Sequence, residues 1–299
     1  MSIALEIEEL RECPLCGNRA DLRRLVVTRD FETGTGEFPI DECASCSLAF
    51  TNPRPTEASL PALYSGRDTP DFAVGSKGLA QRLRDFSILR YLKPRLAPHS
   101  GDHIDMLDFG CGDGSLSYHA ANSYPKIAVT SVDFHDQSPP LLGHTQGRAT
   151  YKSYWNWRET PQLYDAIFLR HVLEHHPEPK RLLVELYDAL KPHGVLHIEV
   201  PNRKSIWAKV FGRNFFAYYV PRHLLHFDSS SLNYAIQGSG LAVLEIRKAH
   251  TPVIGRSLGN ALARDIDNLG LFGLASFPLQ ILLDFFSGRS TTLRASARK

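Results

Sequence analysis

Four of the five cysteines form two Cys-x-x-Cys pairs, a spacing that is typical of a metal site. Each pair can place two thiolates on one ion from a tight turn, so two pairs can complete a tetrahedral zinc site. Because four thiolates leave no open coordination position, the expected zinc is structural and not catalytic. Residues 26–40 between the pairs are expected to form a hairpin with Gly34 and Gly36 at its tip, and a redox pair is the alternative interpretation of the cysteines. The expected metal ligands are Cys13, Cys16, Cys43 and Cys46.

A glycine-rich loop, Gly110-Cys111-Gly112-Asp113-Gly114, follows the apolar run that ends in Leu107-Asp108-Phe109. Glycines permit a tight turn and let a ligand approach the backbone. The GxGxG spacing behind an acid favours a cationic ligand over the pyrophosphate of a dinucleotide, for which a third glycine one position later is usual. Asp133 ends the next apolar run, and an acid there can accept hydrogen bonds from both ribose hydroxyls of an adenosyl group. The alternative is a structural turn with two solvated acids. Cys111 within the loop is expected to be a small packing residue rather than a reactive thiol.

The segments that must position this loop alternate between short apolar runs and helical patterns. Strands are expected at Ile104–Phe109, Ile127–Val132, Ala166–Leu169 and Val195–Val200, each bounded by Gly, Pro, Asp or Asn. Residues Arg181–Leu190 place four leucines on one side and are expected to form a crossover helix. This alternation predicts a parallel sheet with right-handed crossovers.

An amphipathic helix is expected ahead of the sheet. Apolar residues recur at steps of three and four from Leu79 to Leu92, and Phe86 lies within that series. Pro94 and Pro98 are expected to close the helix.

The composition excludes several classes of protein. A hydrophobic fraction of 43% supports real cores, and 34 Lys and Arg against 32 Asp and Glu leave a net charge of only +2, which argues against nucleic-acid binding. The first ten residues carry three glutamates where a secretory signal would be basic and then apolar. With the paired cysteines, these features favour a cytoplasmic protein, either soluble or peripherally associated with a membrane.

Three stretches together resemble the class I S-adenosylmethionine-dependent methyltransferases: LDFGCGDG, SVDF and YDAIFLRHVLEHHPEPKRLLVELYDALKPHGVLHIEVPN. The resemblance covers residues 104–299 and implies an α/β fold with a doubly wound, Rossmann-like sheet that binds S-adenosylmethionine. The paired-cysteine segment in front, followed by Phe50-Thr-Asn-Pro-Arg-Pro, resembles bacterial biosynthetic tailoring methyltransferases, a group that includes sugar C-methyltransferases.

The resemblance also implies roles for individual residues at the cofactor. Asp108 and the loop glycines would hold the methionine end, and Asp133 would bind the ribose. The adenine would lie near Phe134 and residues 154–156. The expected cofactor-binding residues are Asp108, Gly110, Cys111, Gly112, Gly114, Asp133, Phe134, Trp155 and His171.

Methyl transfer needs an aligned acceptor and a base that removes its proton. Seven of the 13 histidines fall between His171 and His226, near the expected strand ends, and an aromatic loop between them can exclude water. Three of these histidines can also be read as a second metal site, although no motif such as HExxH accompanies them. The candidates for the base are His171, His223, His226, Glu199 and Tyr218.

Three parts of the chain are expected: a zinc-binding domain at 1–52, a helical linker or lid at 53–100, and a methyltransferase domain at 101–299. A helical insert at about 252–288 would separate the closing antiparallel strands Leu241–Ile246 and Thr292–Ala297. Residues 269–286 of this insert are strongly apolar. They fit a cap over the acceptor pocket, which is favoured, or a homodimer interface, or an interfacial membrane helix.

The leading functional hypothesis is methyl transfer to a small or carrier-linked biosynthetic intermediate, such as a sugar, a polyketide or a lipid-linked acceptor, with a His or Glu base. An RNA methyltransferase whose zinc domain grips the RNA is a second hypothesis, which the dispersed basic residues disfavour. A non-catalytic protein that only binds S-adenosylmethionine is the third.

Overall fold

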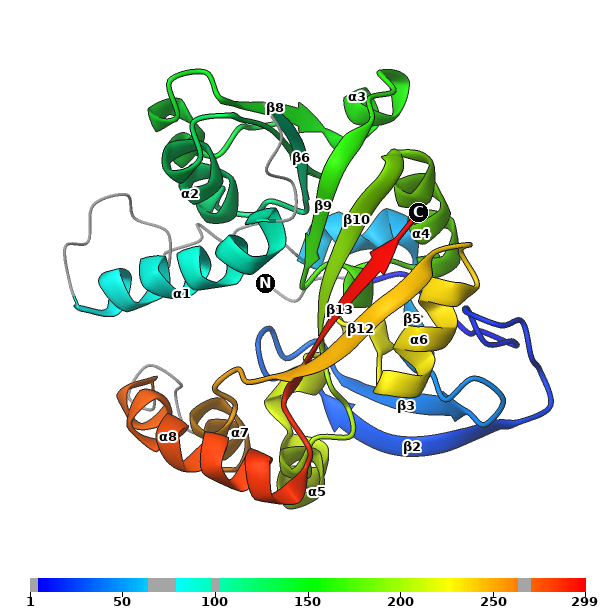
Figure 1. Ribbon diagram of the computed structural model, residues 1–299. Coiled ribbons are helices and arrows are strands. Elements are labelled where there is room, and N and C mark those ends of the chain that lie inside the picture. The colour runs from blue at the N-terminus through cyan, green and yellow to red at the C-terminus, as the bar shows by residue number, and fades with distance from the viewer. Residues whose placement is uncertain (1–4, 64–78, 98–102, 263–269) are drawn as a thin grey trace.

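The computed structural model describes residues 5–63, 79–97, 103–262 and 270–299 (Figure 1). Within these ranges no helix is long and apolar enough to cross a membrane.

The centre of the protein is a seven-stranded sheet with the strand order β12-β13-β10-β9-β6-β7-β8. The five strands from β6 to β10 are parallel, and β13 runs antiparallel to both of its neighbours. The strands are β6 (Ile104–Phe109), β7 (Ile127–Asp133), β8 (Ala149–Ser153), β9 (Tyr164–Arg170), β10 (Leu190–Pro201), β12 (Ala242–Ala249) and β13 (Thr292–Arg298). The order reverses at β6, and the crevice beyond the carboxyl ends of strands at such a point is where ligands bind in open α/β sheets.

This topology confirms the expected doubly wound, Rossmann-like fold. The four expected strands form β6, β7, β9 and β10, and the closing antiparallel pair forms β12 and β13. Strand β10 is longer than expected, because it already begins at Leu190 and contains a register irregularity before Val195.

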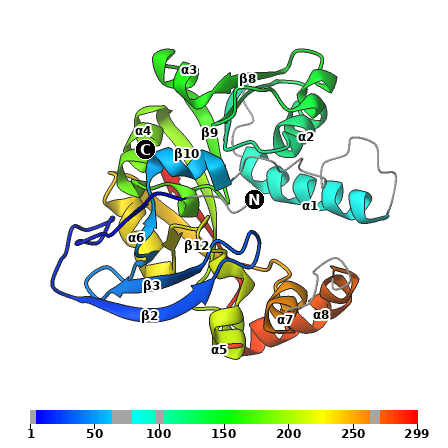
Figure 2. The same cartoon turned by 180° about the vertical axis from the view of Figure 1, so that it is seen from behind.

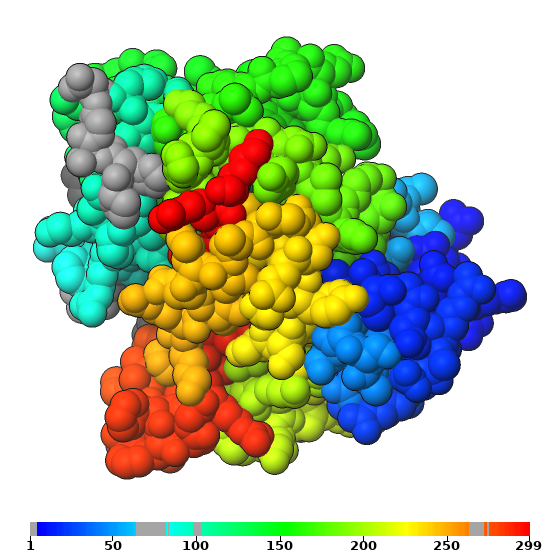
Figure 3. All heavy atoms as spheres, turned by 45° about the vertical axis from the view of Figure 1, so that its right-hand side comes forward, coloured from blue at the N-terminus to red at the C-terminus, as the bar shows by residue number. Residues whose placement is uncertain are grey.

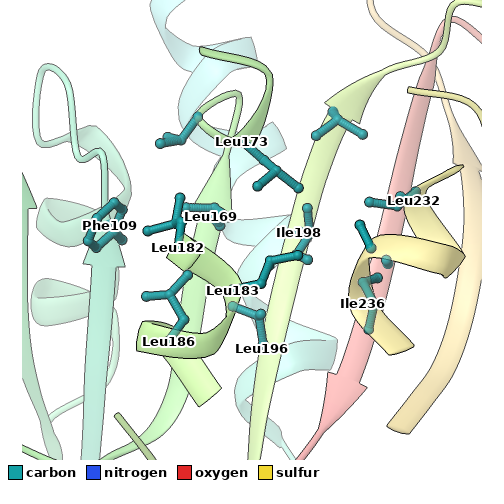
Figure 4. Close-up of a cluster of buried hydrophobic side chains, with 14 of the residues drawn as sticks. Phe109, Leu169, Leu173, Leu182, Leu183, Leu186, Leu196, Ile198, Leu232 and Ile236 are labelled. Atoms are coloured by element: carbon teal, nitrogen blue, oxygen red, sulfur yellow. The ribbon is translucent and has the colours of Figure 1, made fainter. Parts of the chain in front are cut away.

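Helices cover both faces of the sheet. Helices α4 (Pro179–Asp188) and α6 (Ser229–Gln237) cover one face, where leucines of α4 pack on Leu169 and Ile198 (Figure 4). Helices α1 (Leu79–Leu96) and α2 (Ser115–Ser123) cover the other face, and α3 (Tyr154–Glu159) follows β8. The expected crossover helix is therefore α4.

Helix α1 differs from the expectation in two ways. Pro94 does not end the helix, because it lies within the last turn, which continues to Leu96. Phe86 is 63% exposed, whereas Ile88, Tyr91 and Leu92 are buried against the sheet. The buried face therefore contains Leu92 of the expected series but not Phe86. Pro98 lies outside the described residues.

A second sheet, of four strands, is built mainly from the N-terminal residues. Strands β2 (Leu22–Arg29) and β3 (Glu37–Cys43) form the expected hairpin, and the sheet order is β11-β4-β3-β2. Strand β4 (Ala49–Thr51) pairs with β11 (Leu225–His226), which lies much later in the chain, between α5 and α6. The small pair β1 (Ile7–Glu8) and β5 (Arg54–Pro55) lies beside a 3-10 helix at Glu57–Leu63. The N-terminal residues thus share a sheet with the methyltransferase part, and the boundary at residue 52 stays a prediction.

The segment between the closing strands is helical, as expected. Helix α7 (Ile254–Leu262) and helix α8 (Gly270–Ser287) pack together beside α5 (Ile206–Phe211), as both views show (Figures 1 and 2). Because β12 is antiparallel to β13 and β13 is antiparallel to β10, β12 runs parallel to β10. The insert therefore leaves the sheet at its carboxyl edge, where the glycine loop also lies.

Candidate active site

The glycine loop lies at the carboxyl end of β6 and is held against β7. The Gly110 backbone N–H donates to the Val132 carbonyl at 2.7 Å. Gly110 has a φ of +72°, and a Cβ at this position would lie 2.2 Å from Val172 Cγ2. Only glycine fits there, because both the backbone conformation and the space exclude a side chain.

Gly112 differs from Gly110, because the space where its Cβ would stand is open. Its φ is +53°, and no heavy atom lies within 4 Å of where a Cβ would stand. Its backbone N–H donates to Asp133 Oδ2 at 2.8 Å. The loop therefore presents bare backbone beside a carboxylate, which is the arrangement that a ribose and its neighbouring groups need.

Asp108 lies beneath the loop and is only 3% exposed. Its Oδ2 accepts a hydrogen bond from Ser117 Oγ of α2 at 2.7 Å. Burial raises the pKa of Asp108 to about 6, although the bond from Ser117 opposes the rise. Asp108 thus links β6 to α2, and its contact with a cofactor stays a prediction.

Aromatic rings surround the loop on the side of β7 and β8. Phe134 is 47% exposed and Trp155 is 55% exposed, so both offer free faces. Tyr154 lies between them and is buried, with its ring centroid 4.8 Å from that of Phe134. The residues expected near an adenine are therefore together at one edge of the sheet.

Cys111 fits the packing role. The thiol is buried, and burial together with nearby carboxylates raises its pKa, so it stays protonated at neutral pH.

His171 lies between two buried carboxylates just after β9. Its Nδ1 is 3.2 Å from Glu174 Oε1, and its Nε2 is 3.3 Å from Glu199 Oε1. Burial alone would lower the pKa of His171, but the two carboxylates outweigh burial and raise it to about 9. His171 is therefore protonated at neutral pH and cannot accept a proton, which disfavours it as the base. Its φ of +53° is a strained conformation for a residue other than glycine.

Glu199 is also engaged in ion pairs. Its Oε2 lies 2.6 Å from Arg294 Nε, and its pKa lies below the usual range because it bonds to His171 and faces Arg170 and Arg294, despite its burial. A carboxylate held in this way is a poor base. The expectation that Glu199 takes a proton is therefore not supported, and its geometry is that of an anchor for His171.

His223 is neutral, unlike His171. Burial and the neighbouring histidines keep its pKa well below the ordinary value. Its Nδ1 lies 2.9 Å from the Ala217 carbonyl, which fixes Nδ1 as the donor and leaves Nε2 as the acceptor. Nε2 lies 3.9 Å from Glu174 Oε1.

The second metal site is not formed by the expected residues. His226 Nε2 lies 3.1 Å from Thr51 Oγ1. In the described part of the chain, the grouping other than the four paired cysteines that could hold a cation is Glu174, His175 and His223. Their ligand atoms lie within 4.8 Å of one another. Because Glu174 pairs with His171 and also faces His223, we assign this grouping to a proton network.

His226 and Tyr218 lie deeper than expected. His226 is 4% exposed, and burial lowers its pKa to about 3. Tyr218 packs with its ring centroid 5.7 Å from that of His226, and burial raises the pKa of its hydroxyl. Both residues support the contact between β4 and β11, which makes them poor candidates for a base.

The sequence did not single out the arginines that surround the site. Arg95, Arg170 and Arg294 place their guanidinium carbons 4.0, 4.7 and 4.9 Å from the ring centroid of Tyr91. These residues come from α1, β9 and β13, so no local spacing connects them. The sequence also did not single out Glu174, the buried acid that pairs with His171, although it follows His171 by only three residues.

The four paired cysteines lie together at one end of the N-terminal sheet. Cys13 Sγ is 3.5 Å from Cys46 Sγ, and Cys16 Sγ is 3.6 Å from Cys43 Sγ. Tetrahedral zinc–thiolate bonds of about 2.3 Å need sulfur atoms at about this separation. Each pair is followed by a residue with positive φ, Gly17 at +73° and Ser47 at +61°, so the two turns have the same shape. The donor set therefore fits a zinc ion.

Comparison with known proteins agrees with this geometry. A family model described as "Methyltransferase domain" matches residues 81–246. A trans-aconitate 2-methyltransferase of Variovorax paradoxus is 29% identical over 105 residues, which cover 33% of this chain and 39% of that protein. A ubiquinone biosynthesis O-methyltransferase of Nitrosospira multiformis is 28% identical over 155 residues, or 48% of this chain and 64% of that protein. The alignment thus spans about two fifths of the first relative and less than two thirds of the second.

Solved structures show the same fold at low sequence identity. The plantazolicin methyltransferase BamL, in complex with a triazolic desmethylPZN analog and SAH, has a TM-score of 0.51 and 15% identity, covering 81% of this chain and 90% of that one. Coclaurine N-methyltransferase, bound to N-methylheliamine and SAH, has a TM-score of 0.50 and 15% identity, covering 76% of each chain. Since the family model spans more than half of the sequence, the chain belongs to the methyltransferase domain family.

Proposed function

We propose that the protein transfers a methyl group from S-adenosylmethionine to a small or carrier-linked biosynthetic intermediate. The observation that carries the proposal is the open flank of Gly112 beside Asp133, at the point where the strand order of the sheet reverses. When bound, S-adenosylmethionine supplies a methyl group that its sulfonium already activates. The chain must then hold the cofactor, align an acceptor and remove a proton.

Four residues would hold the cofactor. Asp133 would accept hydrogen bonds from the ribose, and the exposed faces of Phe134 and Trp155 would contact the adenine. Gly112 would let the ligand lie against the backbone. The SAH-bound methyltransferases that share the fold make this cofactor the natural choice.

We assign the base to His223. Its Nε2 is unprotonated and faces Glu174, so an acceptor proton that moves to Nε2 would form an imidazolium next to a carboxylate. Glu174 would stabilise that charge. His171 stays protonated throughout and would stabilise negative charge on the acceptor.

The charge around His171 favours an acceptor with an anionic group. Arg170 and Arg294 are each about one-third exposed, and with His171 they provide more positive charge than Glu199 and Glu174 neutralise. A half-buried excess of positive charge attracts a carboxylate or a phosphate. Trans-aconitate, the substrate named for two of the relatives, carries carboxylates.

We also propose that the four cysteines bind one structural zinc ion. A hydrogen bond from Cys46 is the main cause that lowers the pKa of Cys13 to about 5, so a thiolate is available at neutral pH. The ion would fix the end of a sheet that borders the site through β11.

Metabolite profiling with an isotopically labelled methyl donor tests the proposed reaction. Cells with the native chain, the Asp133→Ala variant and a gene deletion are compared for metabolites that gain a labelled methyl group. We expect a labelled product that is present with the native chain and absent with the other two. A labelled product that persists in the deletion, or the absence of any difference in small molecules, would refute the proposal.

A further inference from the structure

Helix α8 packs on the protein through its polar side chains. Among its described residues the buried ones are Gly273, Gln280 and Asp284. Gln280 Oε1 accepts a hydrogen bond from the Val253 backbone N–H at 3.0 Å, and Gln280 Nε2 donates to the Thr251 carbonyl at 2.8 Å. A surface helix normally buries its apolar side and exposes its polar side. In α8 this arrangement is inverted.

Asp284 fixes the same face. It is 1% exposed, and it accepts hydrogen bonds from Trp207 Nε1 and His250 Nδ1, both at 2.8 Å. A Cβ at Gly273 would lie 3.6 Å from Gly255 Cα, so α7 and α8 cross in close contact at these glycines. These contacts hold α8 in one orientation.

The outward face of α8 is apolar over most of its length. Phe285 and Phe286 are 78% and 76% exposed, and their rings contact each other edge to face with centroids 5.8 Å apart. Leu262 at the end of α7 and Val210 on α5 are also exposed. Helix α8 lies at the surface of the protein, in orange-red at the lower left of Figure 3. A patch of this kind marks an interaction site, because water contact with so much apolar surface is unfavourable. Among the residues of α8 whose side chains are described, the exposed large apolar ones are Phe272, Leu279, Ile281, Leu282, Leu283, Phe285 and Phe286. The favoured role of these side chains as a cap over an acceptor pocket is not supported, because they point to solvent.

The charges beside this face are of one sign. Among the described residues of α5, α7 and α8, the only carboxylate is the buried Asp284. Lys209 on α5, Arg256 on α7 and Arg289 just after α8 are exposed. Within the described residues of these three helices, an apolar face with basic residues and no exposed acid is complementary to a bilayer that contains anionic lipids. Two copies that met through this face would instead bring like charges together.

We propose that α8 is an interfacial anchor that lies in the surface of an anionic lipid bilayer, with its buried polar face still on the protein. The glycine loop and the insert lie at the same edge of the sheet. Docking through α8 therefore brings the cofactor edge near the bilayer. If the proposed methyl transfer is correct, the acceptor is lipid-linked or partitions into the bilayer.

Vesicle flotation of the full chain tests the anchor. Vesicles of phosphatidylglycerol and phosphatidylcholine are compared with pure phosphatidylcholine at low and high salt. We expect the native chain to float with the anionic vesicles at low salt. The floated fraction should be at least fivefold smaller at high salt or with neutral vesicles. A native chain that floats with neither kind of vesicle would overturn the proposal.

A matched pair of variants distinguishes vesicle binding through the apolar face of α8 from nonspecific adsorption of the chain. Leu282→Ser on α8 and Leu163→Ser before β9 change leucines that are 50% and 48% exposed, at opposite edges of the sheet. The double variant Leu282→Ser, Phe285→Ser should float at least fivefold less than the native chain, while Leu163→Ser should float normally. Thermal unfolding confirms that each variant is folded.

Light scattering after size-exclusion chromatography tests whether a second copy of the chain, and not a bilayer, covers the apolar face of α8. A native dimer that the double variant converts to a monomer, with no vesicle binding, would show that a second copy covers the face. Equal flotation of the double variant and the native chain would also overturn the proposal. None of these measurements depends on turnover. Membrane binding can therefore be refuted while the proposed methyl transfer stands, and methyl transfer can be refuted while membrane binding stands.

Discussion

The Nε2 atom of His171 lies 3.3 Å from Oε1 of Glu199, an ion pair between the ends of two adjacent parallel strands. Glu199 in turn bonds to Arg294 on the antiparallel strand β13. The protonation state of His171 therefore depends on residues that are distant in the sequence.

Glu199→Gln should lower the pKa of His171 from its raised value of about 9 by about one unit or more, because one of its two anionic partners is lost. A proton NMR titration of the His171 ring measures this change. Glu245→Gln, on the edge strand β12, is the control and should leave the titration unchanged. An unaltered His171 pKa in Glu199→Gln would refute the ion-pair explanation.

The same pair determines how stability depends on pH. The pKa of His171 is raised on folding, so its contribution is complete below its ordinary value of 6.5 and is lost as the pH rises through about 9. The native chain should therefore lose stability between pH 7 and 9.5, and His171→Gln should lose less over that range. Urea unfolding at several pH values measures both. Parallel curves for the two proteins would contradict the prediction.

Asp133→Ala should weaken the binding of S-adenosylhomocysteine at least tenfold. The substitution removes the carboxylate that would accept two hydrogen bonds from the ribose hydroxyls. Each such bond to a charged group contributes about 1.5–3 kcal/mol. Isothermal titration calorimetry gives the affinity. Asp136→Ala changes an exposed acid three residues away and should bind normally. Equal affinities for the two variants would rule out the ribose assignment.

Gly110→Ala should destabilise the protein more than Gly112→Ala. Both positions have positive φ, which costs an alanine about 1–2 kcal/mol. At Gly110 the new Cβ also meets Val172 Cγ2, and such overpacking adds about 1–3 kcal/mol. Chemical denaturation gives the two free energies of unfolding, and calorimetry should show that Gly112→Ala loses cofactor affinity while it remains folded. The opposite order of stability would contradict the loop geometry.

Purified protein should contain one zinc ion per chain. The double variant Cys13→Ser, Cys16→Ser should lose the metal and unfold at a lower temperature, because metal binding contributes to folding. Elemental analysis and a thermal melt measure these two effects. Cys111→Ser should keep its zinc, since Cys111 lies in the glycine loop. Full zinc in the double variant would exclude the proposed ligand set.

His223→Ala should reduce turnover by about 10² or more while cofactor affinity stays normal, as expected for the loss of a general base. The assay uses the labelled product that metabolite profiling identifies. His226→Ala is the comparison, because His226 is equally buried but faces Thr51, so it should lower stability more than turnover. Normal turnover in His223→Ala would remove it as the base.

Features that depend on short stretches of the chain could be predicted from the sequence alone. The spacing of the four cysteines, the glycines after Asp108 and the alternation of apolar runs predicted the cysteine cluster, the loop and the positions of four parallel strands. These features follow from local backbone preferences and side-chain periodicity, which neighbouring residues determine.

Features that depend on partners far along the chain were decided by the tertiary structure. His171 follows an expected strand end, where a base was predicted, but Glu199 arrives from the next strand and, together with Glu174, raises the pKa of His171 to about 9. The apolar residues of α8 suggested a buried cap, but Gln280 and Asp284 find hydrogen-bond partners on other elements and turn the apolar side to solvent. The physical reason is that charge state and burial are set by the groups that folding brings together, whereas helix and strand formation is set mainly by local sequence.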